Sequence, residues 1–196
     1  MFLSLAMPAF ILLMITAIGI LVSRDWRAII GFFAAQYIGV LILVGLSWPF
    51  GLAIIKLIVG WMACVVLGMT QTGHKQVIPS ERYWPANRVF RILTAVLAMI
   101  ILFTLTPPVN SWLPGANIWI IRGGITLIAM GLLQLGMTSR PFRVIIGLMI
   151  VLSGFEILYS VVESSVLVAG LLAAINFGLT LLGSYFLSIS TPEELA

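Results

Sequence analysis

Seven apolar runs, each long enough to cross a lipid bilayer, follow one another along the 196-residue chain. A hydrocarbon core about 30 Å thick needs about 20 apolar residues in a helix. Only 8% of the residues are charged and 62% are hydrophobic, whereas about a quarter are charged in a soluble domain. We therefore expect an all-α integral membrane protein with about seven transmembrane helices, at residues 2–22, 28–46, 51–70, 89–106, 118–137, 144–162 and 166–188.

Short polar or proline-containing segments separate these runs. The first two breaks are Ser23–Arg27 and Ser47–Phe50, and the longest polar stretch runs from Gln71 to Arg88. Thr106–Gly115, which contains three prolines, is expected to break the chain before the fifth helix, and Pro141 to mark the turn before the sixth. The first run lacks the basic residues that open a cleavable signal peptide, so we expect it to be retained as a helix.

Lysine and arginine residues outside the runs are confined to alternate loops. The segments around the first, third and fifth breaks carry them, and the second and fourth breaks carry none. Since Lys and Arg concentrate in cytoplasmic loops, we expect a multi-pass protein of the cell inner membrane with its N-terminus outside. Its tail, Thr191–Glu194, is then cytoplasmic. The residues behind this prediction are Arg24, Arg27, Lys75, Arg82, Arg88, Arg140 and Arg143, with Arg91 just inside the fourth run.

The chain contains an internal repeat. Ser23–Gly31 (SRDWRAIIG) aligns with Ser139–Gly147 (SRPFRVIIG), and each segment precedes the second helix of a group of three. We interpret this as two parallel three-helix units, because an extra fourth helix restores the orientation of the second copy. The expected divisions are 1–70 (first unit), 71–117 (cytoplasmic loop and linking helix) and 118–196 (second unit). The alternative is a common cytoplasmic turn that occurs twice.

The residue types exclude most catalytic centres within this chain. A single cysteine, Cys64, and a single histidine, His74, exclude a disulfide framework, a cysteine-ligated cluster and bis-histidine haem. No glycine-rich phosphate loop, His–Glu metal motif or serine elbow is present. The basic residues are too dispersed for a nucleic-acid partner. We expect no cofactor, no metal and no catalytic residue here, and leave open whether the chain is a non-redox subunit of an enzyme.

Glu156 and Lys56 are charged residues inside apolar runs, where an ionisable group needs a specific reason. Glu156 stands past the middle of the sixth run. It is either a proton-relay group or a neutral side chain that makes one interhelical hydrogen bond. Lys56 lies about a turn and a half from the outer end of the third run. It either extends outward to the membrane surface or faces a carboxylate of a neighbouring subunit as a proton-relay cation.

Uncharged polar residues and glycines complete the candidates. Asn176 falls where the seventh helix should be deep in the membrane, and it is the third proton-relay candidate. Gln36 and Gln134 are expected to make interhelical hydrogen bonds, and Arg122 to extend to the outer surface. Four glycines have spacings suited to close helix contacts: Gly147, Gly154, Gly178 and Gly183.

One short segment resembles a known membrane subunit. Gly154–Ser160 (GFEILYS), eleven residues after Arg143, is similar to the second-helix segment of subunit K of respiratory complex I. That segment carries a buried glutamate. The next helix of subunit K carries a second buried glutamate after a Leu-Ala-Ala-apolar run. Here Leu172–Ile175 (LAAI) is followed by Asn176.

The whole chain resembles the E-type membrane component of formate-hydrogenlyase-type (group 4) hydrogenases, whose C-terminal half is subunit-K-like. The residues that carry this resemblance are Arg27, Gly31–Gln36 (GFFAAQ), Lys56, Arg143 and Gly147. It implies a place in the membrane arm of a complex-I-like oxidoreductase, beside large antiporter-like subunits.

The chain departs from the subunit-K pattern at two positions. Asn176 stands at the second carboxylate, and Val40 stands in the first copy at the place of Glu156. An amide does not exchange a proton near neutral pH, so Asn176 could at most orient water. We therefore expect Glu156, with Lys56, to join a polar axis that neighbouring subunits complete.

Three other functions stay open at this point. The chain could be a purely structural scaffold that bridges antiporter-like subunits, which the missing second carboxylate favours. It could be a subunit of a multisubunit cation/proton antiporter, whose small subunit also resembles subunit K but is about half as long. It could be an independent secondary transporter, for which broken helices at matching places in both halves are expected.

Overall fold

The computed structural model describes residues 2–73, 88–112 and 115–189, and this part contains seven α-helices and no strand. Each helix is long and apolar enough to cross a membrane. The prediction of an all-α, multi-pass membrane protein with seven transmembrane helices is confirmed. The helices are α1 (Phe2–Val22), α2 (Trp26–Val44), α3 (Phe50–Gly73), α4 (Arg88–Trp112), α5 (Ile118–Gly136), α6 (Pro141–Val162) and α7 (Val166–Ile189).

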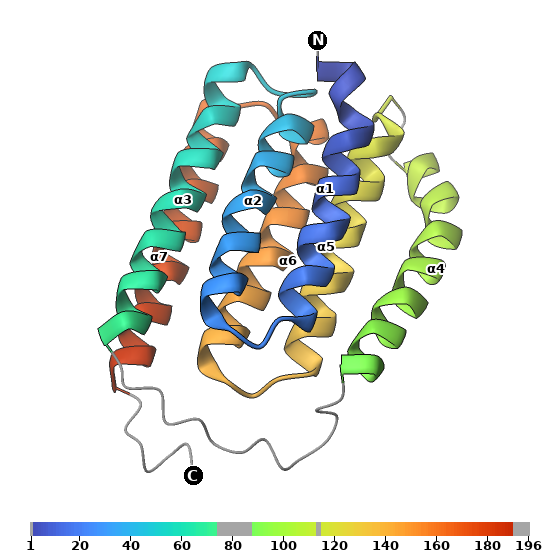
Figure 1. The fold of residues 1–196 in the computed structure, drawn as a ribbon. Coiled ribbons are helices and arrows are strands. Elements are labelled where there is room, and N and C mark those ends of the chain that lie inside the picture. The colour runs from blue at the N-terminus through green and yellow to red at the C-terminus, as the bar shows by residue number, and fades with distance from the viewer. Residues whose placement is uncertain (1, 74–87, 113–114, 190–196) are drawn as a thin grey trace.

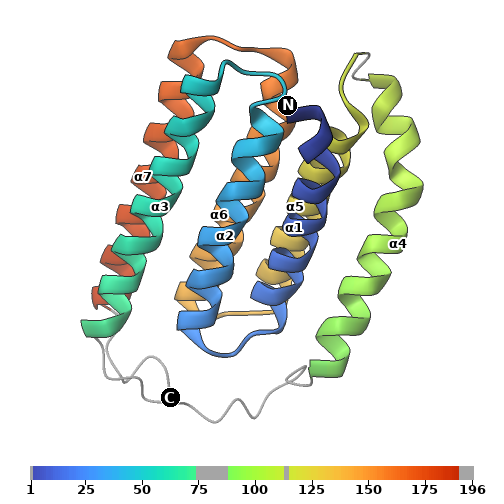
Figure 2. The ribbon, with the colours of Figure 1, turned by 45° about the horizontal axis from the view of Figure 1, so that its top comes forward.

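Six of these helices form two layers (Figures 1 and 2). α1, α2 and α3 lie in one layer, and α5, α6 and α7 lie in the other. Across the layers α1 packs on α5, α2 on α6 and α3 on α7, and the helices of each pair run in the same direction. α4 lies at the edge, against α5 and α1. This pairing fits two parallel three-helix units, while the division at residues 70 and 117 stays a prediction.

Local chemistry sets where α2 and α6 begin. The Asp25 side chain accepts a hydrogen bond of 3.1 Å from the Arg27 backbone N–H, so it caps α2. This helix therefore begins at Trp26, slightly earlier than predicted. Pro141 is the first residue of α6 and does not belong to the turn before it. A proline fits there because the N–H that it lacks has no helical partner at that position.

The predicted break at Thr106–Gly115 is wrong in its position. α4 continues through Pro107 and Pro108 and ends at Trp112. The two prolines lie within the last six residues of the helix, so the turns before them keep their hydrogen bonds. Only the carbonyls four residues earlier lose a helical partner. The helix therefore continues for four residues beyond Pro108, and the link between α4 and α5 is shorter than predicted.

α5 and α6 approach so closely that backbone meets backbone. Gly124 and Gly131 of α5 face Gly154 and Gly147 of α6, and the two glycines on each helix are seven residues apart. A methyl group added at Gly154 would lie 2.7 Å from the Gly124 carbonyl oxygen. One added at Gly131 would lie 2.9 Å from the Gly147 carbonyl oxygen. The predicted close contacts at Gly147 and Gly154 are confirmed.

The two glycines of α7 that were expected to make close contacts differ from each other. Gly183 packs against the Ile145 side chain, with 2.7 Å between an added methyl group and its Cδ1. The prediction for Gly178 is wrong, because nothing lies within 4 Å of a methyl group placed there. α7 buries the face that holds Asn176, Thr180 and Gly183, and Gly178 lies off this face.

Two buried arginines bind the carbonyl end of α1. Arg91 of α4 donates a hydrogen bond of 3.0 Å to the Leu21 carbonyl, and Arg143 of α6 donates one to the Ser23 carbonyl. The last carbonyls of a helix lack helical partners and carry partial negative charge. The two cations therefore complete this end of α1 and tie α4 and α6 to it.

Some of the predicted features lie outside the described residues. These are His74, Lys75, Arg82 and the tail Thr191–Glu194. The described loops that hold Arg24 and Arg140 lie at the same end of the bundle, below the ends of α1 and α5 in Figure 1.

Candidate functional site

Lys56 of α3 and Glu156 of α6 form a buried ion pair. The Lys56 Nζ donates to Glu156 Oε1, and each residue is only 1% exposed. The two residues are 100 positions apart in the sequence and come from different predicted three-helix units. The two positions that the sequence suggested for the Lys56 side chain are therefore wrong, while its role as a proton-relay cation stays a prediction. It neither extends to the membrane surface nor requires a carboxylate from another subunit, because its partner lies in the same chain.

Asn176 of α7 joins this pair. Its Nδ2 donates a hydrogen bond of 2.9 Å to Glu156 Oε1, the oxygen that Lys56 also contacts. Its Oδ1 lies 3.5 Å from the Tyr37 hydroxyl, which donates to it from α2. The structure thus brings the three predicted relay residues together and adds a fourth. We call Tyr37, Lys56, Glu156 and Asn176 the polar cluster.

Close packing of α2 on α3 fixes the position of Tyr37. Gly60 stands one turn after Lys56 on α3, and a methyl group on it would lie 2.3 Å from the Tyr37 ring. The ring can therefore lie directly against the backbone of α3. Phe33 supports it from the same helix with an edge-on ring contact of 5.0 Å between centroids. The Tyr37 hydroxyl also interacts with the side chain of Ser153, on α6.

The two oxygens of Glu156 differ in their surroundings. Oε1 accepts from both Lys56 and Asn176. Oε2 is buried and has no hydrogen-bond partner among the described residues. A buried polar atom without a partner is uncommon in proteins and calls for an explanation. Its lone pairs make Oε2 the atom of the polar cluster at which a proton or a water molecule can bind.

Sequence reasoning missed Tyr37, although a signal for it was present. Tyr37 falls in the middle of an apolar run, whereas tyrosine in membrane helices is enriched near the lipid headgroups. A buried tyrosine usually finds a partner for its hydroxyl. A tyrosine at mid-membrane depth therefore indicates a polar group on a neighbouring helix.

The two predicted glutamine contacts are not found. Gln36 and Gln134 are both buried. Neither amide atom of Gln36, and not the Nε2 of Gln134, has a hydrogen-bond partner among the described residues. Val40, which stands in the first unit where Glu156 stands in the second, is a fully buried core residue.

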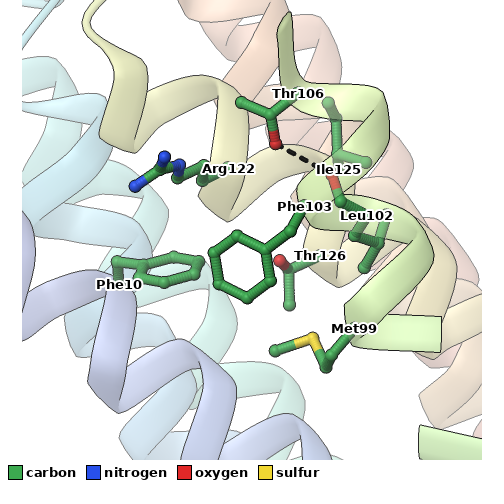
Figure 3. A pocket seen from close by; sticks show the side chains of 8 residues that line it. All are labelled: Phe10, Met99, Leu102, Phe103, Thr106, Arg122, Ile125 and Thr126. Carbon is green, nitrogen blue, oxygen red and sulfur yellow. Dashed lines mark hydrogen bonds between the residues drawn. The ribbon is translucent and has the colours of Figure 1, made fainter. Parts of the chain in front are cut away.

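Arg122 lies in a different part of the fold, between α1, α4 and α5. Its guanidinium packs against the rings of Trp119 and Phe103, at 5.2 and 5.6 Å from their centroids. It borders a cavity of about 10 Å³, which has room for about one water molecule. Figure 3 shows that Phe10, Met99 and Thr126 also line this cavity. This place shares no residue with the polar cluster.

Comparisons with protein-family models, with curated proteins and with solved structures found no match for this chain. Among the described residues, no three His, Cys, Asp or Glu side chains come together in a group that could hold a metal ion.

Proposed function

We propose that this chain is a membrane-arm subunit of a complex-I-like or group 4 hydrogenase-like oxidoreductase. In that arm it contributes to a proton-translocation path and bridges antiporter-like subunits. The observation that carries the proposal is the buried Lys56–Glu156 pair, which joins the two predicted units. Charged side chains inside membrane proteins are rare and typically mark ion or proton pathways. The resemblance of Gly154–Ser160 to subunit K supports the choice of parent complex.

The pair can pass protons without a change in its own charge over a full cycle. It begins as an ammonium and a carboxylate. A proton that binds Glu156 Oε2 makes the neutral acid and weakens the attraction between the two groups. Lys56 then releases a proton, and transfer of the proton from Glu156 to Lys56 restores the starting state. One proton enters and one leaves in each cycle.

Asn176 positions the carboxylate in this mechanism, and the Tyr37 hydroxyl in turn donates to Asn176. An amide does not exchange protons near neutral pH, so Asn176 acts by holding Glu156 Oε1 through its 2.9 Å hydrogen bond. With Oε1 held by two donors, Oε2 is the oxygen left for proton uptake.

The proposal includes an orientation in the cell inner membrane. Loop arginines concentrate on the cytoplasmic side of membrane proteins, so the end that holds Arg24 and Arg140 is cytoplasmic. The N-terminus is then outside and the C-terminus inside. Lys56 lies in the half of α3 nearer the outer surface, so it is the group that releases the proton outward.

A structural scaffold is the second candidate function. The observation that favours it is that Lys56, Glu156 and Asn176 bind one another within a single chain and so hold α3, α6 and α7 together. A subunit of a multisubunit cation/proton antiporter is a further alternative, because the resemblance to subunit K fits that class as well.

Purification of the tagged chain in a mild detergent, with mass spectrometry of its partners, tests the assignment to a complex. We expect antiporter-like subunits together with a peripheral arm that carries iron–sulfur or nickel–iron proteins. Antiporter subunits without such an arm would support the antiporter alternative. A chain that purifies only with itself would contradict every membrane-arm interpretation.

Substitution Glu156→Gln tests the relay. It removes the exchangeable carboxylate and keeps a side chain of nearly the same shape, so we expect the parent complex to assemble but to translocate far fewer protons per turnover. Glu163→Gln is the matched control, because Glu163 is exposed at the end of the same helix. The measurement is proton uptake into inverted membrane vesicles, with complex assembly followed on native gels. Unchanged translocation in Glu156→Gln would favour the scaffold.

A further inference from the structure

α7 carries a line of polar side chains that begins at the polar cluster. Asn176, Thr180 and Ser184 follow one another at four-residue spacing, which places them on one face of the helix. Asn176 bonds to Glu156 of α6, and Ser184 lies 2.6 Å from the Thr70 hydroxyl of α3. This face therefore lies at the junction of α3, α6 and α7. The rest of α7 is strongly apolar.

The hydroxyls of this line can bind water as well as their present partners. Thr180 donates 2.8 Å to the Asn176 carbonyl, one turn earlier on the same helix. A threonine hydroxyl that donates in this way keeps lone pairs that can accept from water. Glu156 Oε2 lacks a partner among the described residues. The line therefore ends at an atom that can accept a hydrogen bond from water.

Exposure increases along the line away from the cluster. Asn176 and Thr180 are fully buried, Thr70 and Ser184 are half-buried, and Thr72 is exposed. α3 and α7 stay side by side down to this end of the bundle, which is the end of the α1–α2 and α5–α6 loops (Figure 1). The polar side chains thus form a graded series from that end of the bundle to the buried pair.

The opposite end of the bundle differs. On α6 Ser160 lies one turn after Glu156, and its hydroxyl donates a hydrogen bond of 2.7 Å to the Ile157 carbonyl of its own helix. The buried indole of Trp48 donates 2.8 Å to the Glu163 carbonyl and so ties the α2–α3 link to the end of α6. Polar side chains therefore extend from Glu156 mainly toward the arginine-bearing end.

We propose that the line formed by Asn176, Thr180, Ser184 and Thr70 is the proton access route to Glu156 from the arginine-bearing end of the bundle. Water molecules that bind to these hydroxyls carry the proton, because the hydroxyls accept and donate hydrogen bonds but do not change charge. A proton from the aqueous side moves along this water to Glu156 Oε2 and makes the neutral acid. The inference rests on the proposed relay and adds the side from which the relay is loaded.

Substitution of Thr180 tests the route in the intact membrane complex. Thr180→Val keeps the size of the side chain and removes the hydroxyl. Proton translocation should fall by about fivefold or more, the factor that loss of one typical hydrogen bond brings in a rate. Thr180→Ser should retain most of the wild-type rate. Ser160→Ala, which removes a hydroxyl one turn to the other side of Glu156, should have little effect. A larger loss in Ser160→Ala than in Thr180→Val would overturn the inference.

Water access can be measured without any proton assay. In a Cys64→Ala background, Thr180→Cys and Ser184→Cys should react with a membrane-impermeant thiosulfonate added from the arginine-bearing side in sealed vesicles. Leu182→Cys is the control, because Leu182 is 58% exposed on the apolar outer surface of α7 and should not react. Labelling of Thr180→Cys from the opposite side only, or no labelling of it, would overturn the route.

The two proposals fail in different ways. If Glu156→Gln leaves translocation unchanged, the relay itself is wrong. If Glu156→Gln stops translocation while Thr180→Val does not and Thr180→Cys stays unlabelled, the relay stands and only the access route is wrong.

Discussion

At the scale of residues, the sequence could identify members of the polar cluster but could not predict that they contact one another. Glu156 and Lys56 could be selected from the sequence because ionisable groups inside a membrane are costly. Their contact could not be predicted. It depends on the rotation of α3 and α6 and on how the two layers pack, and neither is encoded in the local pattern around either residue.

The energy of the ion pair can be measured with a double-mutant cycle. Lys56→Met leaves a buried carboxylate without its cation, which typically destabilises a protein by about 3–5 kcal/mol. Lys56→Met combined with Glu156→Gln removes both charges, so most of that loss should be recovered. The measurement is the free energy of unfolding of the purified chain in detergent micelles. A double variant as unstable as Lys56→Met alone would show that Lys56 acts through packing and not through its charge.

At the scale of helices, the sequence predicted where each helix lies along the chain but gave little information on which helices pack together. The seven spans were found because the apolar runs are long and their breaks are polar. The end of α4 was missed because proline was taken as a stop signal, although α4 continues for four residues beyond Pro108. Small residues marked Gly147 and Gly154 of α6 as points of close approach, but they did not predict which helix packs there.

That close approach makes a specific prediction for glycine substitutions. Gly154→Ala places a methyl group 2.7 Å from the Gly124 carbonyl oxygen, a backbone atom that cannot move aside without separating α5 from α6. We expect a loss of about 1–3 kcal/mol in stability, measured as a lower unfolding midpoint in detergent. Gly178→Ala is the matched control, because nothing lies within 4 Å of the added methyl group. Equal effects of the two substitutions would contradict this account of the α5–α6 contact.

At the scale of the whole molecule, the number of helices constrains how the chain can sit in a membrane. A chain with seven membrane-spanning helices has its two ends on opposite sides of the membrane. Reporter enzymes that are active on only one side, fused to the N-terminus or to the C-terminus, should therefore give opposite signals. The loop charges further predict that the C-terminal fusion reports the cytoplasm. Equal signals from the two fusions would mean that one helix does not span the membrane. α4 would be the first helix to examine, because it lies at the edge of the bundle.

The distance between Lys56 and Glu156 along the chain also has a consequence during synthesis. At about 5–20 residues per second, Glu156 is made about 5–20 s after Lys56, because 100 positions separate them. Throughout this interval the newly inserted α3 carries a cation whose counter-ion does not yet exist. Lys56 lies close enough to one end of α3 for its side chain to reach the headgroups in the nascent protein. The ion pair can therefore form only after α6 has been made, and Asn176 of α7 joins the polar cluster later still.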